Sequence, residues 1–214
     1  MLAFRDKPEV SVSVPDQLML EKATPILRQD ERLWPAVSQL SLPPLPIHQN
    51  LYQGLIRSVV YQQLSGKAAG TIHGRFLDLF EDRYPHTDEI LHFDEEELRA
   101  VGLSRQKAGY IQNVARFFTE HDTTELVQLE DEALIKELTH IKGIGTWTVQ
   151  MILLFNLGRP DVFPPDDLGI QKAMQQIYGL EGRGRQLKQA MLAIAENWRP
   201  YRSVATRLLW RYLD

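Results

Sequence analysis

Two short segments carry residue types that could do chemistry. The first is Ile141-Lys142-Gly143-Ile144-Gly145, followed by Thr146. Its glycines can adopt positive φ and leave backbone N–H groups accessible, and Lys142 adds a cation, so this segment could hold a phosphate without recognising a base sequence. The second segment is Asp166-Asp167, which follows two prolines and an apolar approach. One of these carboxylates could therefore face a substrate rather than water.

Helical patterns flank both segments and would position them. Residues 131–139 carry apolar side chains at helical spacing, and residues 146–157 are nearly all apolar, as in a buried helix. A plain turn between two helices is the alternative interpretation of the glycine segment. For Asp166 and Asp167, the alternative is a helix cap with a favourable charge at the start of the helix predicted over residues 168–178.

The remaining chain also predicts helices, and strand signals are nearly absent, so the sequence predicts an all-α fold. A short strand or extended arm is expected over residues 1–15. A Pro-rich linker follows the second helix. Asn50, Ser65, Asp94 and Ser104 are predicted to begin or cap helices. The further helices are expected over residues 16–28, 30–40, 50–61, 65–80, 94–101, 104–118, 185–198 and 200–213.

Composition excludes several classes of protein. The chain has 214 residues, 43% of them hydrophobic, and no Cys. The absence of Cys excludes disulfides, thiolate metal sites and cysteine-ligated iron–sulfur clusters. The sequence has neither a signal-peptide pattern nor an apolar run of membrane length, so we expect an intracellular protein without a membrane partner.

Charge is distributed unevenly along the chain. The net charge of −4 argues against a nucleic-acid partner, but residues 140–214 contain ten basic and six acidic side chains, a net +4, which leaves −8 for the rest. A local basic face can bind phosphates on an acidic protein. An ordinary solvated surface rich in arginine is the alternative interpretation.

The run I-K-G-I-G-T-W-T followed by D-V-F-P-P-D-D resembles the helix-hairpin-helix (HhH-GPD) DNA glycosylase superfamily. Within it, the sequence is most similar to the alkylbase branch of the 3-methyladenine DNA glycosylase II type, from about residue 52 onward. The resemblance implies two helical lobes with the active-site cleft between them. Residues 52–158 would form one lobe, with the hairpin at 139–147, and residues 1–51 plus 159–214 would form the other.

The resemblance also implies an activity. It is that of a monofunctional glycosylase that flips out and hydrolytically removes alkylated purines, of the 3-methyladenine and 7-methylguanine type, in base excision repair. By position, Asp167 matches the catalytic aspartate, which stabilises the oxocarbenium ion, and Asp166 resembles a helix-start residue. Trp147 stands where strand-cutting relatives carry a Schiff-base lysine, so no lyase activity is expected. DNA binding is expected at Lys142, Gly143, Ile144, Gly145 and Thr146.

Aromatic residues are the expected walls of the base pocket. Trp147 and Trp210 match pocket positions of the alkylbase branch, and Met151 lies one turn after Trp147, where close relatives have an aromatic residue. Such faces bind a cationic base by stacking and cation–π attraction. Core packing is the alternative for each tryptophan. Phe155 and Trp198 are predicted as core residues.

The segment Gln62-Gln63-Leu64-Ser65 resembles the loop with which the superfamily fills the gap left by an extruded base. On this resemblance, Leu64 is the expected wedge and Gln63 would contact the orphaned base. A staple of Leu64 against its own helix is the alternative.

The implied partner is double-stranded DNA containing alkylated bases, bound by a monomer. No metal and no cofactor is expected, apart from a possible monovalent cation at the hairpin loop. The protein would work in the cytoplasm or nucleoid of a bacterium, or in the nucleus of a eukaryote. Three alternatives remain: a glycosylase of the same fold for another lesion, a non-catalytic helix-hairpin-helix DNA-binding module, and an all-α interaction protein without a DNA partner.

Overall fold

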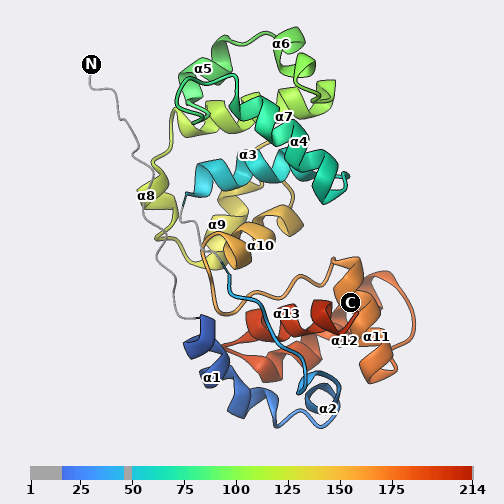
Figure 1. Ribbon diagram of the computed structural model, residues 1–214. Coiled ribbons are helices and arrows are strands. Elements are labelled where there is room, and N and C mark those ends of the chain that lie inside the picture. The colour runs from blue at the N-terminus through green and yellow to red at the C-terminus, as the bar shows by residue number, and fades with distance from the viewer. Residues whose placement is uncertain (1–15, 46–49, 214) are drawn as a thin grey trace. The chain divides into compact units, whose positions relative to one another are not determined.

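The computed structural model describes residues 16–45 and 50–213, and every regular element in those ranges is a helix (Figure 1). The all-α prediction is therefore confirmed. The strand or arm predicted for residues 1–15 lies outside the described residues. Within the described ranges, no helix has the length and apolar character needed to cross a membrane.

The described chain divides into two compact units, and the first comprises residues 50–152. Its organising element is α7 (Arg105–Phe118), which packs against α3, α5 and α6 (Figure 1). Buried Ile111 and Val114 lie on the inner face of α7. The other helices are α3 (Leu51–Tyr61), α4 (Gly66–Leu77), α5 (Thr87–His92), α6 (Glu95–Ala100), α8 (Thr123–Leu126), α9 (Asp131–Leu138) and the start of α10 (Thr146–Phe155).

Four helix starts in this unit confirm the capping prediction. The side chains of Asn50, Ser65, Asp94 and Ser104 each accept a hydrogen bond from a backbone N–H three residues later. Such a bond satisfies one of the donors left without a partner in the first turn. These boundaries are local, which explains why the sequence predicts them.

The second unit comprises residues 16–45 and 153–213. Its centre is α13 (Arg202–Tyr212), which packs against α11, α1 and α2. Trp198 is fully buried in this core, as predicted. The other elements are α1 (Asp16–Leu27), α2 (Leu33–Val37), α11 (Leu168–Tyr178), α12 (Gly184–Ala195) and the 3₁₀ turn η1 (Glu196–Trp198).

The observed boundary between the units falls inside α10, after Ile152. The family resemblance implied a boundary after Gly158. The difference arises because the last turn of α10 belongs to the second unit by its contacts: the Arg159 N–H donates to the Leu153 carbonyl, and Phe155 stacks on Trp210.

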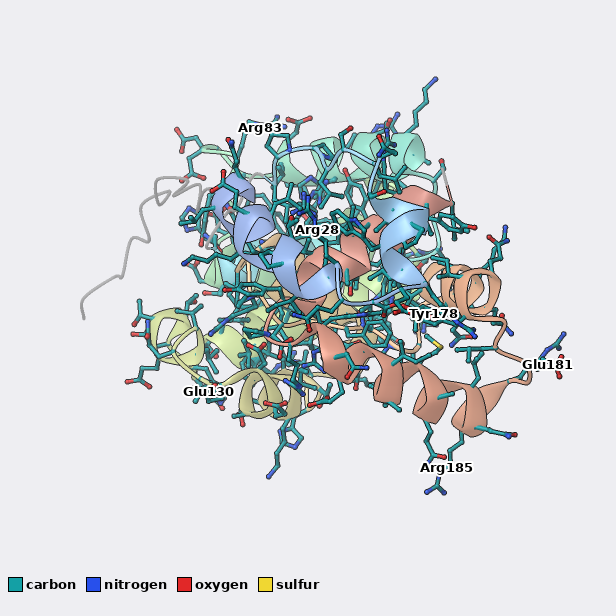
Figure 2. The ribbon with its side chains drawn as sticks, turned by 90° about the horizontal axis from the view of Figure 1, so that it is seen from below. Arg28, Arg83, Glu130, Tyr178, Glu181 and Arg185 are labelled. Carbon is teal, nitrogen blue, oxygen red and sulfur yellow. The ribbon has the colours of Figure 1, made fainter. Side chains whose placement is uncertain are left out.

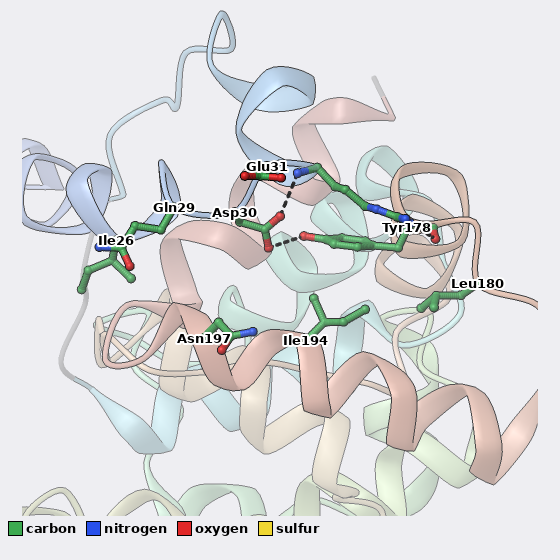
Figure 3. Close-up of a pocket in the computed structure, with 9 residues that line it drawn as sticks. Ile26, Gln29, Asp30, Glu31, Tyr178, Leu180, Ile194 and Asn197 are labelled. Atoms are coloured by element: carbon green, nitrogen blue, oxygen red, sulfur yellow. Dashed lines mark hydrogen bonds between the residues drawn. The ribbon is translucent and has the colours of Figure 1, made fainter.

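Helix α2 is shorter than predicted. A helix was expected over residues 30–40, but α2 spans Leu33–Val37. Just before it, the Asp30 carboxylate accepts from the N–H groups of Arg32 and Leu33, a local side-chain bond that competes with helical geometry. The same carboxylate accepts from Tyr178 Oη at 2.6 Å (Figure 3) and from Trp198 Nε1 at 2.9 Å. Burial alone would raise the pKa of Asp30, but these four donors hold it below its usual value.

A pocket adjoins Asp30 and is lined by residues of α1, α11, α12 and η1 (Figure 3). Tyr178, on its wall, ends α11, whereas Asp167 precedes the first residue of that helix. At a rise of about 1.5 Å per residue, the two ends lie roughly 16 Å apart. This pocket is therefore distinct from the surroundings of Asp167.

Candidate functional site

Asp167 is held in a fixed orientation at the start of α11. Its Oδ1 accepts a hydrogen bond from the Ile170 N–H and a second from Trp210 Nε1, each at 2.9 Å. The next residue but one is Gly169, where a Cβ would lie only 3.1 Å from both Asp167 Oδ1 and Trp210 Cδ1. Two donors on one oxygen leave the carboxylate little freedom to rotate, so the site is preorganised.

Helix α13 anchors the segment that leads to Asp167. The Asp161 carboxylate accepts from Arg202 Nε at 2.7 Å. The Val162 N–H then donates to Ser203 Oγ, and its carbonyl accepts from Thr206 Oγ1, both at 2.9 Å. Residues 203, 206 and 210 share one face of a helix. One face of α13 thus fixes both the lead-in segment and, through Trp210, the carboxylate.

Asp166 and Asp167 differ from the prediction in one respect. The sequence analysis assigned the helix-start role to Asp166, but Asp167 is the N-cap of α11. Asp166 is exposed and forms an ion pair with Lys188 of α12. Capping and substrate contact are compatible for Asp167, because an N-cap uses one carboxylate oxygen.

Phe155 is not a core residue, and this prediction was wrong. Its side chain is 38% exposed, and its ring stacks on Trp210 with centroids 5.7 Å apart and planes 19° apart. Phe155 closes an unbroken apolar run, which carries no periodic signal to separate an outward-facing residue from a buried one. The second unit therefore presents an aromatic pair beside Asp167.

The hairpin loop, residues 139–145, is shaped by α7. Gly143 adopts φ +107°, and a Cβ there would lie 2.2 Å from Cγ of the Tyr110 ring. Asn113 Nδ2 donates to the Lys142 carbonyl at 3.2 Å. Because the C=O and N–H of a trans peptide point in opposite directions, this bond aims the Gly143 N–H away from α7. Lys142 is exposed on the same loop.

Ile144 departs from the other residues predicted to bind DNA. Its side chain is only 5% exposed, and its N–H donates to the Ile141 carbonyl at 3.0 Å. That N–H is therefore committed to the turn and anchors the loop instead of facing a phosphate. Gly145 and Thr146 are exposed at the start of α10.

Trp147 and Met151 occupy the first turns of α10 in the first unit. Trp147 is 43% exposed, which argues against core packing, and Met151 is partly buried. At a spacing of four residues, the two side chains lie on one helix face. The first unit thus exposes an aromatic face directly after the hairpin loop.

The wedge turn, residues 62–65, links α3 to α4. Gln63 adopts φ +56°, unusual for a residue with a side chain. The Leu64 N–H donates to the Tyr61 carbonyl at 3.3 Å, while its side chain remains 40% exposed. This exposure is too large for a side chain stapled onto its own helix, so the turn presents Gln63 and Leu64 to solvent.

Much of the C-terminal positive charge serves the fold. Arg199 and Arg202 bind Asp161, Arg207 is 6% exposed and donates to a backbone carbonyl, and Lys188 pairs with Asp166. Arg185, by contrast, extends from the start of α12 into solvent, and the acidic Glu181 extends from the loop before α12 (Figure 2). Counting charges along the sequence therefore overestimated the basic surface.

A preorganised aspartate after a rigid approach, together with a glycine hairpin supported by a separate helix, defines a recognised class. The HhH-GPD superfamily of base excision DNA repair proteins matches residues 56–200, and the chain belongs to this family. The family prediction from sequence is thereby confirmed.

Three proteins similar to this chain show which members of the superfamily it resembles. The chain is 35% identical to the Bacillus subtilis protein YfjP over 179 residues, which are 80% of this chain and 62% of that protein. A solved structure of the Schizosaccharomyces pombe 3-methyladenine DNA glycosylase Mag1 in complex with abasic DNA is 34% identical, with a TM-score of 0.75, and the match covers 88% of this chain and 95% of Mag1. A DNA-3-methyladenine glycosidase from Bacillus halodurans is 35% identical, with a TM-score of 0.77, covering 94% and 90%.

Proposed function

We propose that this protein is a monofunctional DNA glycosylase that hydrolytically removes alkylated purines, of the 3-methyladenine and 7-methylguanine type, from double-stranded DNA in base excision repair. We propose that it acts as a monomer. The observation that carries the proposal is the Asp167 carboxylate, oriented by the Ile170 N–H and Trp210 Nε1. The names of Mag1 and the Bacillus halodurans glycosidase support the substrate class.

The chemistry follows from charge. When the C1′–N bond breaks, the bonding electrons leave with the purine and the sugar develops oxocarbenium character. A fixed carboxylate stabilises that cation without having to reorganise, and water then adds to C1′ and loses a proton. An alkylated purine already carries positive charge and is a good leaving group. Asp167 is therefore the proposed catalytic residue, and no general acid is required.

Aromatic faces would bind the cationic base. Trp210 is fixed beside Asp167 through its Nε1 and through stacking on Phe155, so its ring plane is defined before the base arrives. Each cation–π contact contributes about 0.5–2 kcal/mol. Trp147 and Met151 remain proposed base contacts on the first unit. Because Trp147 is not a lysine, it cannot form a Schiff base with the sugar.

The hairpin loop is the proposed phosphate contact, through Lys142, Gly143, Gly145 and Thr146. Replacing Lys142 with alanine should weaken binding to every duplex sequence alike. It should also reduce the slope of log affinity against log salt by about 1, because one phosphate contact is lost. Binding titrations at several salt concentrations measure this slope. Lys136→Ala, an exposed lysine at the end of α9, is the matched control and should keep the wild-type slope.

Leu64 is the proposed wedge, and Gln63 the proposed contact to the orphaned base. No organic cofactor or divalent metal enters the proposal. A monovalent cation at the hairpin loop fits its chemistry, because the carbonyls of Ile141, Lys142 and Gly143 each accept one hydrogen bond and each retain a second lone pair. No step of the reaction is assigned to it.

The proposal is tested by incubating the protein with methylated duplex DNA and identifying released bases by mass. We expect free 3-methyladenine or 7-methylguanine and, with borohydride present, no trapped covalent complex. A trapped complex would contradict the monofunctional assignment. DNA binding without any base release would favour a non-catalytic DNA-binding module, for which Asp167 would be only a helix cap.

A further inference from the structure

Gln62 joins the wedge turn to the hairpin loop. It is the first residue after α3, and its Nε2 donates to the Gly143 carbonyl at 3.1 Å across a sequence separation of 81 residues. The side chain is partly buried, so water competes less for this bond than on an open surface. Gln62 thus connects the two loops of the first unit for which DNA contacts are proposed.

The two loops also share a support on α7. Lys107 Nζ donates to the Val60 carbonyl at the end of α3 at 2.7 Å, and Asn113 Nδ2 donates to the Lys142 carbonyl. Between them, the Tyr110 ring lies against Gly143. Residues 107, 110 and 113 follow one another along one side of the helix. Helix α7 supports the wedge turn and the hairpin loop separately, whereas the Gln62 side chain joins the two by a direct hydrogen bond.

The wedge turn needs such an anchor. Gln63 holds a left-handed backbone conformation, which is strained for a residue with a side chain and persists only where the surroundings impose it. Gln62, its neighbour, also uses its backbone N–H to end α3 through the Ser58 and Val59 carbonyls. Both the backbone and the side chain of Gln62 therefore fix the conformation in which Gln63 and Leu64 face solvent.

We propose that Gln62 is a positioning residue that couples wedge insertion to the hold of the hairpin loop on the DNA backbone. When the hairpin loop binds the phosphates, the Gly143 carbonyl holds the Gln62 side chain in place. Gln62 in turn fixes the position and orientation of the Leu64 side chain. The inference rests on the proposed function, because it requires a duplex with a gap for the wedge to fill. It needs no base release, however, so it can be tested separately.

The test compares affinity for a duplex with a tetrahydrofuran abasic site against affinity for the undamaged duplex. Gln62→Ala should lower this abasic preference about tenfold, the effect of one sheltered hydrogen bond. The matched control is Gln112→Ala, which removes a side-chain amide bond of 3.0 Å to the Phe93 carbonyl elsewhere in the same unit. It should leave the preference unchanged, and urea unfolding should show a similar stability loss for both variants.

A double-mutant cycle separates positioning from general support. Leu64→Ala should also reduce the preference, and Leu64→Ala with Gln62→Ala should reduce it no further, because Gln62 acts through Leu64. Additive losses, or an unchanged preference in Gln62→Ala, would overturn the proposal.

Should Gln62→Ala fail to fold, Gln62→Glu provides the test. A carboxylate facing the Gly143 carbonyl repels it, whereas the protonated acid donates to it. The abasic preference of this variant, relative to wild type, should therefore return as the pH is lowered, and its failure to return would count against the inference.

If wild type releases no base yet shows a Gln62-dependent preference, the proposed function fails and the inference stands. A wild type without abasic preference refutes the inference.

Discussion

Replacing Asp167 with asparagine should leave a folded protein that binds DNA and releases almost no base. Asparagine caps a helix as well as aspartate does, and its Oδ1 can still accept from the Ile170 N–H and Trp210 Nε1. What disappears is the negative charge that we propose to stabilise the developing oxocarbenium ion. Loss of one preorganised electrostatic partner typically costs about 100- to 1,000-fold in rate, and we expect a loss in that range.

Single-turnover release of methylated purine, followed by mass, measures this effect. The control is Asp166→Asn, which removes the neighbouring charge and its ion pair with Lys188 on an exposed surface. It should retain nearly the wild-type rate, because exposed pairs contribute little. Equal rates in Asp167→Asn and wild type, or equal losses in both variants, would refute the catalytic assignment of Asp167.

Replacing Gly143 with alanine should disrupt the hairpin loop. The new Cβ would lie 2.2 Å from Tyr110 Cγ, and the residue would have to hold φ +107°, so the ring or the loop must move. Overpacking costs about 1–3 kcal/mol. The backbone conformation adds a further cost of about 1–3 kcal/mol. We expect the free energy of unfolding to fall by the sum of these two costs, about 2–6 kcal/mol. We also expect duplex binding to weaken as the loop moves.

Urea unfolding and duplex titration together measure this prediction. Gly145→Ala is the control for stability, because its Cβ would meet no atom within 4 Å and its φ is not positive. It should change the free energy of unfolding by less than about 1 kcal/mol. Gly143→Ala combined with Tyr110→Ala should recover the steric part alone. A stable Gly143→Ala protein with unchanged binding would contradict the role of this close contact.

Local features of the sequence predicted much of the fold. The caps at Asn50, Ser65, Asp94 and Ser104 each depend on an N–H three residues away, and the structure confirms them. The family assignment from the hairpin and Asp167 segments is confirmed as well. Signals of this kind are complete within a few residues, so they can be read from the chain alone.

Long-range contacts explain where the prediction differed. The Asp30 carboxylate, which bonds the N–H groups of Arg32 and Leu33 next to α2, also accepts from Tyr178 and Trp198, which lie 148 and 168 residues further along the chain. Phe155 was assigned to the core because an apolar run does not reveal which of its residues meets Trp210. The count of basic residues overestimated the basic surface for the same reason, because Arg202 and Arg207 bond partners that are distant in sequence.

The sequence by itself determined an all-α member of the HhH-GPD family with a glycine hairpin and a candidate aspartate, because helix periodicity, caps and glycine spacing are local properties. Only the tertiary structure decided how Asp167 is oriented, by a tryptophan 43 residues away, and that the wedge turn is tied to the hairpin loop through Gln62. The physical reason is that a hydrogen bond requires about 3 Å between its atoms, and only the folded chain brings such distant residues so close.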